Sequence, residues 1–129
     1  MLDFGLLFLR VVVSLLMILG HGVPKILNPQ SHINLVEMAF HTGPLSPILA
    51  YLSIAAETLF QVFILFGIFT RVSSLISSIN MLVALFFLIF IRGADFPTYE
   101  KALLYFVIYI FLVFSGAGRY SFDELIRKR

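Results

Sequence analysis

Two apolar runs decide the fold of this chain; they read LDFGLLFLRVVVSLLMILG from Leu2 to Gly20 and ILAYLSIAAETLFQVFILFGIF from Ile48 to Phe69. At 1.5 Å per helical residue, each is close to or above the ~30 Å thickness of the hydrocarbon layer. Each also has a charge near its middle, Arg10 in the first and Glu57 in the second. A charge at that depth costs about 2.5–3.5 kcal/mol on insertion scales, so we expect the two to pair inside a bundle.

Two further apolar runs follow, and the composition agrees with a membrane protein. The chain is 60% hydrophobic with a mean hydropathy of +1.04, well above the roughly 45–50% apolar content of soluble domains. The first run has no basic region before it and contains Arg10, so we expect a retained helix rather than a signal peptide. The predicted fold is a single all-α domain over 1–129, an up-and-down antiparallel bundle of four transmembrane helices at about 2–20, 48–69, 72–91 and 99–115.

The connections differ in length. Helices two and three, and three and four, are joined by short links, whereas an outer loop spans 21–47 and a cytoplasmic tail spans 116–129. Within the outer loop Ser31 is a candidate N-cap, and three apolar residues after it share one helical face. We therefore expect a short interfacial helix over the mouth of the bundle, with its apolar face formed by Ile33, Val36 and Phe40.

Basic residues give the predicted orientation. One side carries Arg71, Arg119, Arg127, Lys128 and Arg129, and the other carries Lys25, Arg92 and Lys101. The positive-inside rule then predicts that both termini lie in the cytoplasm. Because these charges sit at helix ends, the formal net charge of +2 indicates a lipid bilayer as the partner and not nucleic acid.

Each predicted helix carries one polar stripe, and lipid would penalise all four. We expect the stripes to meet at the bundle axis and form a buried polar core that binds a ligand. Whether the Arg10–Glu57 pair is functional or only fixes helix register is left open at this stage. The predicted core residues are Arg10, Ser14, His21, Lys25, Glu57, Gln61, Asn80, Tyr105 and Tyr109.

The chain has no cysteine, which excludes disulfide relays, thiolate nucleophiles, iron–sulfur clusters and Cys-ligated zinc. His21, His32 and His41 with Glu37 match no metal-ligand spacing, so we expect no metal site. We expect no intrinsic cofactor. Any electron chemistry must then belong to a bound cofactor or to a partner protein.

The order and spacing of several segments resemble the DoxX family of small bacterial membrane proteins. These are LRVVVSLLMILGHGVPK from Leu9, FGIFTR ending at Arg71, EKALLY from Glu100 and SGAGRYSFD from Ser115. The resemblance implies a four-helix inner-membrane protein associated with oxidoreductase systems, among them a thiosulfate:quinone oxidoreductase and a complex with superoxide dismutase and a sulfurtransferase. The positions that match the family are Arg10, His21, Gly22, Lys25, Glu57, Arg71, Glu100, Gly118, Arg119 and Tyr120.

Three functions are consistent with this sequence. The first is a membrane subunit of a quinone-linked oxidoreductase complex, which binds quinone or a similar hydrophobic ligand in the polar interior and receives electrons from a redox partner protein. The second is a non-enzymatic scaffold or assembly factor. The third is a small transporter, which would need a homo-oligomer for alternating access. The sequence contains no complete active site, and it leaves open whether the protein is catalytic at all.

Overall fold

The computed structural model describes residues 1–127, and this range contains helices and turns but no strand. Two segments, η1 and η3, are π-helical turns that continue a preceding α-helix, and η2 is a 3₁₀ turn. The elements in chain order are α1 (Leu2–Met17), η1 (Ile18–Gly22), α2 (Val23–Leu27), α3 (Pro29–Phe40), η2 (Gly43–Leu45), α4 (Ser46–Glu57), α5 (Leu59–Phe66), α6 (Thr70–Phe86), η3 (Phe87–Ile91), α7 (Phe96–Ser115) and α8 (Phe122–Arg127).

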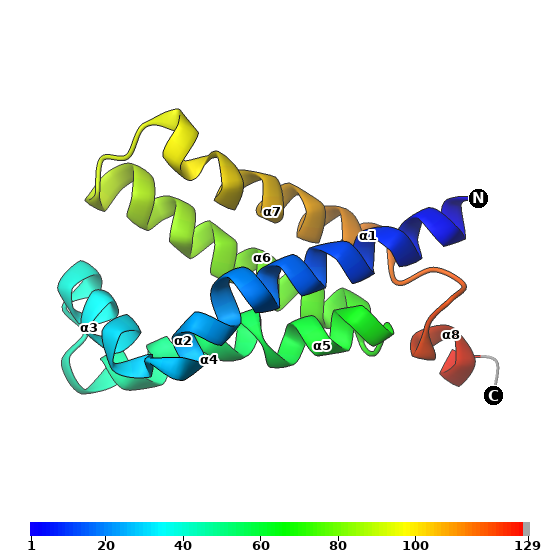
Figure 1. The fold of residues 1–129 in the computed structure, drawn as a ribbon, viewed down its shortest axis with the longest axis horizontal. Helices are drawn as coiled ribbons and strands as arrows, with labels where there is room; N and C mark the ends of the chain where they lie inside the picture. The colour runs from blue at the N-terminus through cyan, green and yellow to red at the C-terminus, as the bar shows by residue number, and fades with distance from the viewer. Residues whose placement is uncertain (128–129) are drawn as a thin grey trace.

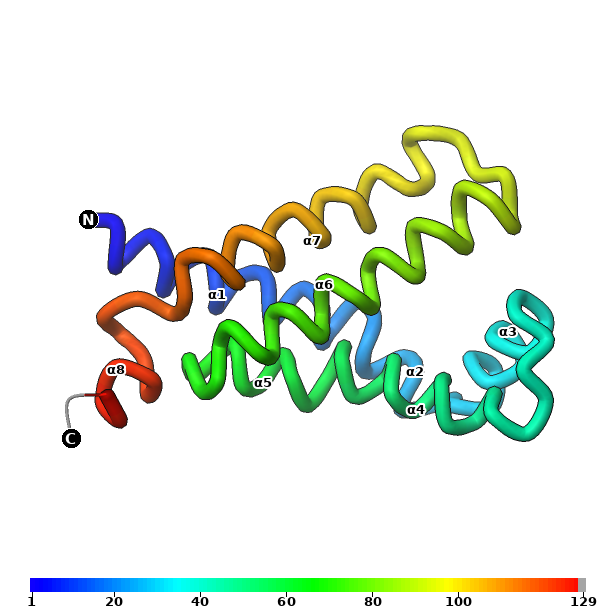
Figure 2. Tube along the Cα trace, turned by 180° about the vertical axis from the view of Figure 1, so that it is seen from behind, coloured from blue at the N-terminus to red at the C-terminus, as the bar shows by residue number. Residues whose placement is uncertain are grey.

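Four helical segments are long and apolar enough to cross a membrane: Leu2–Leu27, Gly43–Phe66, Thr70–Ile91 and Phe96–Ser115. They run alternately up and down, with Met1 and α8 at one end of the molecule and α3 at the other (Figure 1). Seen from behind, α6 lies between α5 and α7 and packs against both (Figure 2). The predicted all-α membrane fold is confirmed.

The first span ends at Leu27, beyond the expected Gly20. Pro24 does not stop it, because the proline lies in the first turn of α2, where its missing N–H is not needed. A helix over the outer end is present as α3, but Ser31 lies inside it. Its N-cap is Asn28, whose side-chain oxygen accepts a hydrogen bond of 3.3 Å from the Ser31 backbone N–H.

The chain after α7 folds back onto the turn between α5 and α6. The backbone N–H of Asp123 donates to the Gly67 carbonyl at 2.8 Å. Its carboxylate accepts from the backbone N–H groups of Phe69 at 2.7 Å and Thr70 at 2.9 Å, which caps the start of α6. The part of the expected tail that the structure describes, 116–127, is therefore attached to the bundle.

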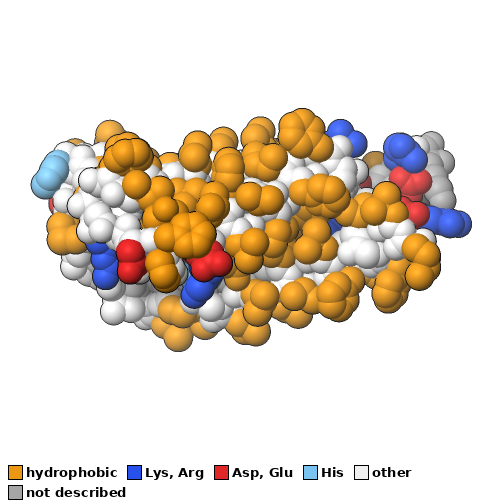
Figure 3. Space-filling model, turned by 90° about the horizontal axis from the view of Figure 1, so that it is seen from above, with side chains coloured by type: hydrophobic (Ala, Val, Ile, Leu, Met, Phe, Trp, Pro, Cys, Tyr) orange, Lys and Arg blue, Asp and Glu red, His pale blue; other side chains and the backbone are white. Residues whose placement is uncertain are grey.

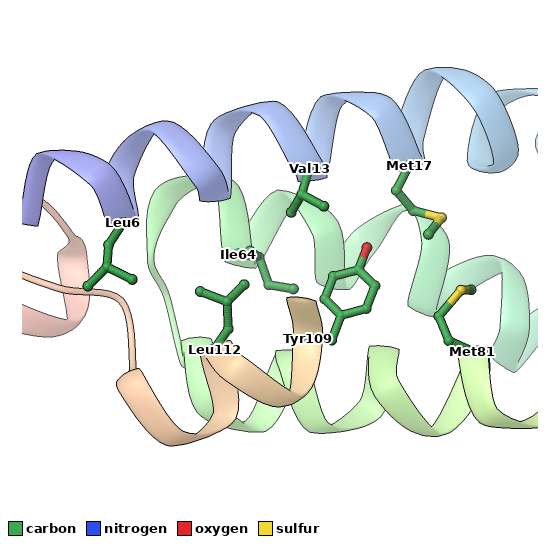
Figure 4. Packing of buried hydrophobic residues seen from close by; sticks show 7 residues of the cluster. All are labelled: Leu6, Val13, Met17, Ile64, Met81, Tyr109 and Leu112. Atoms are coloured by element: carbon green, nitrogen blue, oxygen red, sulfur yellow. The ribbon is translucent and has the colours of Figure 1, made fainter. Parts of the chain in front are cut away.

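The apolar core is small and lies between α1, α5, α6 and α7 (Figure 4). Its buried members are Leu6, Val13, Met17, Ile64, Met81, Tyr109 and Leu112. Most other large apolar side chains point outward, and one face shows a broad hydrophobic band with charged side chains gathered towards its ends (Figure 3). A bilayer covers such a band at no solvation cost, so the lipid completes the burial.

Candidate functional site

The second span is broken in its middle, where α4 ends at Glu57 and α5 begins at Leu59. Thr58 has φ −129° and ψ −73°, outside the helical region. The π-helical turn η1 of the first span packs against this break. Gly22 in η1 comes so close that a Cβ there would lie 2.5 Å from the Glu57 carbonyl oxygen and 2.5 Å from the Thr58 methyl. Two irregular stretches of backbone therefore meet at Glu57.

Glu57 is buried and pairs with Lys25, whose Nζ lies 2.5 Å from Oε2. Asn80 on α6 donates from Nδ2 to Oε1 at 3.2 Å. The side chain of Lys25 is 25% exposed and that of Glu57 only 4%, so the pair has one open side. The carboxylate is thus satisfied by groups from the first and third spans, and it holds three of the four spans together.

The predicted Arg10–Glu57 pair is wrong. Arg10 is fully buried, and its Nη1 donates to the carbonyl oxygens of Ile64 at 3.1 Å and Leu65 at 3.4 Å. Its Nη2 donates to the carbonyl of Tyr120. Ile64 and Leu65 lie in the last turn of α5, where the helix dipole favours a cation, and Tyr120 lies in the segment after α7.

The reason lies in the direction of helical side chains. Each Cα–Cβ bond tilts towards the N-terminus of its own helix. Because the first two spans are antiparallel, Arg10 tilts towards the end that carries the termini and Glu57 tilts towards the end that carries α3. Ile64 is seven residues beyond Glu57, about 10 Å along the helix, so Arg10 reaches a different level of the bundle. Lys25 tilts back into the membrane and meets Glu57.

A second polar network fills the break in the second span. The Gln61 amide donates from Nε2 to the Ala56 carbonyl at 2.8 Å and to the Ser77 hydroxyl at 2.8 Å. Its Oε1 accepts from the Tyr109 hydroxyl at 2.9 Å. The Thr58 hydroxyl donates to the Ile54 carbonyl at 2.7 Å. Side chains therefore replace backbone hydrogen bonds that the break removes, as a membrane interior requires.

The remaining predicted core residues either lie apart from Glu57 or only pack beside it. Tyr105 stacks on Tyr109 with ring centroids 6.2 Å apart, and His21 meets the Tyr105 ring edge-on at 5.9 Å. Ser14 is fully buried, and its hydroxyl has no hydrogen-bond partner among residues 1–127. Gln61 and Arg10 are also fully buried, and both are hydrogen-bonded to other groups of the protein.

The four family-matched helix-end positions lie away from this core. Arg71 and Arg119 are exposed at the end that carries the termini, and Glu100 is exposed near the start of α7. Tyr120 has an exposed side chain but takes part through its carbonyl, which accepts from Arg10. These positions form no single site.

A groove of about 550 Å³ opens beside the axis, under α3 and between α4 and α6. Lys25, Glu57, Asn80 and His32 provide its polar end. Its apolar walls include Leu52 and Val83, which lie in membrane-spanning segments and are 61% and 47% exposed. The mouth of the groove therefore faces hydrocarbon, while its polar end is the open side of the Lys25–Glu57 pair.

The polar core predicted from sequence does not include His32. The one signal for it in the sequence is the predicted interfacial helix after Ser31, in which His32 lies. His32 lies on α3 over the groove, and its Nε2 is buried without a hydrogen-bond partner among residues 1–127. Burial, together with the nearby Lys25 cation, lowers the pKa of His32, so the imidazole is neutral at pH 7. A neutral Nε2 beside an open cavity can donate to or accept from a ligand.

Glu37 was considered only as a metal ligand, and it instead fastens α3 to α4. Its Oε2 accepts from the Gly43 backbone N–H at 2.7 Å and from the Ser46 hydroxyl at 2.5 Å. Within the described residues, no three His, Cys, Asp or Glu side chains lie together in a way that could hold a metal ion.

These features define a class: a small helical membrane protein of four spans, with a broken second span and a groove open to lipid. The DoxX family model matches residues 5–89, and an uncharacterized protein of Haemophilus influenzae is 32% identical over 130 residues, 96% of this chain and 92% of that protein. No solved structure matches the chain. The chain belongs to the DoxX family.

Proposed function

We propose that this protein binds a quinone, or a lipid-soluble molecule of similar chemistry, in the groove under α3, and that it does so as a membrane subunit of an oxidoreductase system. The observation that carries the proposal is that Lys25, Asn80 and His32, three groups with spare hydrogen-bonding capacity, lie at the polar end of a cavity that opens into hydrocarbon. A cavity of this size lies within the range of about 300–1,000 Å³ typical of small-molecule sites.

The polar end has unused hydrogen-bonding capacity. An ammonium has three N–H donors and Glu57 engages Lys25, while the Asn80 amide has two donors and directs one to Glu57. His32 Nε2 is buried and unused within the described chain. A quinone head group presents two carbonyl oxygens that accept from such donors, and its isoprenoid tail suits the Leu52 and Val83 walls.

The proposal leaves electron transfer to a partner. The chain has no cysteine to hold a cluster or to act as a dithiol. Reduction of a bound quinone needs two electrons and two protons, and the electrons would come from an oxidoreductase docked on the membrane. We propose the bacterial inner membrane as the location, with both termini in the cytoplasm.

Ala84 and Leu82 provide a matched pair for the test. Ala84 lines the groove, whereas Leu82 lies on the same helix, is 53% exposed and does not line it. We expect Ala84→Phe to fill the cavity and Leu82→Phe to leave it open. The purified proteins would be extracted with organic solvent, and co-purified quinones would be quantified by mass spectrometry.

The expected result is quinone in the wild type and in Leu82→Phe, and about tenfold less in Ala84→Phe, a loss of about 1.4 kcal/mol in affinity. Equal amounts in all three proteins would contradict binding in the groove. No quinone in any of them would contradict the proposal and favour the scaffold alternative.

A further inference from the structure

A second cavity, of about 720 Å³, is lined by residues of α1, α6 and α8 and shares no lining residue with the groove under α3. The N-terminus and α8 lie at the end of the molecule opposite α3 (Figure 1). The lining of the cavity combines the turn between α5 and α6 with the segment that follows α7. Arg71 and Arg119, both singled out in the sequence, line this cavity, and the proposed function uses neither of them. The cavity is therefore separate from the proposed quinone site.

The acidic side chains of this cavity are occupied by the fold. Asp123 accepts from the backbone of Phe69 and Thr70, and Asp3 Oδ1 accepts from the Arg119 backbone N–H at 3.1 Å. Glu124 pairs with Arg127 at 3.0 Å. Neither ion pair within residues 1–127 involves the guanidinium of Arg71 or Arg119. Among residues 1–127, therefore, no carboxylate forms an ion pair with either of these two cations, although Asp3, Asp123 and Glu124 share the lining of the cavity.

The backbone after α7 positions Arg71. Gly116 has φ +73°, and a Cβ there would lie 3.1 Å from Arg71 Nε and 3.4 Å from Nη2. The guanidinium therefore lies close to the Gly116 backbone, where a side chain would force it to shift by a few tenths of an ångström. The positive φ of Gly116 also favours glycine at this position.

An apolar surface adjoins these cations. Phe69 and Val72 flank Arg71 in sequence, line the same cavity and are 64% and 57% exposed. They lie at the inner edges of the second and third spans, where acyl chains begin. The cavity thus joins cationic groups to lipid-facing apolar side chains, which is the complement of an anionic amphiphile.

We propose that this cavity binds the phosphate group of an anionic phospholipid, with Arg71 and Arg119 as its ligands. The planar fork of a guanidinium matches phosphate oxygens, and basic pockets between transmembrane helices at a membrane surface suit anionic head groups. The exposed Phe69 and Val72 assign the phosphate to a lipid and not to a soluble anion. The site is independent of the groove and of its ligand.

Native mass spectrometry of the detergent-solubilised protein, titrated with phosphatidylglycerol or phosphatidylcholine, tests this site. The test variant is Arg71→Gln/Arg119→Gln, and the control is Arg92→Gln/Lys101→Gln, which removes the same charge at the opposite end. We expect phosphatidylglycerol to bind the wild type and the control equally, and the test variant about tenfold more weakly. Phosphatidylcholine should bind all three proteins weakly.

An equal loss in both double variants would overturn the proposal, since it would show a general effect of net charge. Inorganic phosphate that binds the wild type as tightly as phosphatidylglycerol would also overturn the lipid assignment. Circular dichroism checks that the variants are folded. If the double variant is not folded, Arg119→Gln alone can be used, because the Arg119 guanidinium has no ion-pair partner within residues 1–127. This single variant should bind phosphatidylglycerol about fivefold more weakly than the wild type. Unchanged binding would overturn the proposal.

Discussion

At the scale of single residues, the direction of each side chain decides which charges meet. Arg10 and Glu57 both lie deep in apolar runs, and a count of residues along each helix does not show that they point to opposite ends. The Cα–Cβ tilt of antiparallel helices carries Arg10 to the carbonyls of Ile64 and Leu65 and carries Glu57 to Lys25. The sequence was enough to identify the buried ions but not their partners.

Gly22 provides a sharp test at this scale. Its missing Cβ leaves room for the Glu57 carbonyl, so Gly22→Ala should separate the first two spans and destabilise the fold by about 1–3 kcal/mol. Gly20→Ala is the control, because a Cβ at that position meets nothing within 4 Å. Thermal unfolding in detergent should show a lower midpoint for Gly22→Ala alone. Equal midpoints would mean that the close approach at Glu57 is absent.

Gln61 illustrates what the sequence could and could not predict. Its place on a polar stripe with Glu57 was sufficient to predict burial, and the structure confirms that burial. That it serves a helix break could not be predicted, because Thr58 and its neighbours include neither glycine nor proline, the usual breakers. The break depends on contacts between spans, which a stripe on one helix does not contain.

Replacement of Gln61 measures how much its hydrogen-bond network contributes to the free energy of unfolding. Gln61→Leu leaves the Ala56 carbonyl without its 2.8 Å donor and the Tyr109 hydroxyl without its acceptor, so we expect a loss of about 1–3 kcal/mol in the free energy of unfolding. Tyr109→Phe removes one hydrogen bond of the same network and should cost about 0.5–1.5 kcal/mol. A smaller loss for Gln61→Leu than for Tyr109→Phe would contradict the central role of the amide.

At the scale of elements, the carboxylate of Glu37 joins α3 to η2 and α4, and α3 covers the groove. The shared face of Ile33, Val36 and Phe40 after Ser31 predicted a helix at the interface, and the structure places α3 over a cavity. The cavity itself could not be predicted, because it depends on how far α3, α4 and α6 stand apart. Glu37 fixes that arrangement through Gly43 and Ser46.

The attachment of α3 through the hydrogen bonds of Glu37 to Gly43 and Ser46 should depend on pH. The hydrogen bonds from the Ser46 hydroxyl and then from the Gly43 N–H hold the pKa of Glu37 below its ordinary value of 4.5. Its contribution is therefore fully present above about pH 4.5 and is lost as the pH falls through the lower folded-state value. We expect amide hydrogen exchange in α3, corrected for intrinsic rates, to accelerate across that acid window. In Glu37→Gln, the amides of α3 should exchange fast already at pH 7, with little further change at lower pH. An exchange profile like that of the wild type in this variant would contradict a role for Glu37 in holding α3.

At the scale of the whole molecule, the proposed orientation rests on the ends at which basic residues lie. Lys25 was counted as an outer charge, but it lies inside the first span and Glu57 neutralises it. Among described residues outside that pair, Arg71, Arg119 and Arg127 mark the end with the termini, and Arg92 and Lys101 mark the other. Without Lys25, the sequence count becomes five basic residues on the side of the termini, with Lys128 and Arg129 included, against two on the other side, a wider margin than five against three and a stronger argument for the proposed cytoplasmic termini.

Reporter fusions test this orientation. Green fluorescent protein fused after the C-terminus should fluoresce, and alkaline phosphatase at the same point should be inactive. Alkaline phosphatase inserted after His41, between α3 and α4, should be active. The reverse pattern would contradict the orientation, although it would leave the fold and the groove intact.

The contact on which the groove depends is the Lys25–Glu57 pair, and a double-mutant cycle tests it most directly. The free energy of unfolding would be measured for Lys25→Met, Glu57→Gln and their double variant, and again with Arg10→Gln in place of Lys25→Met. We predict a coupling of about 1–3 kcal/mol between Lys25 and Glu57, and additivity within about 0.5 kcal/mol for Arg10 and Glu57. Strong coupling of Glu57 to Arg10, with none to Lys25, would contradict the account.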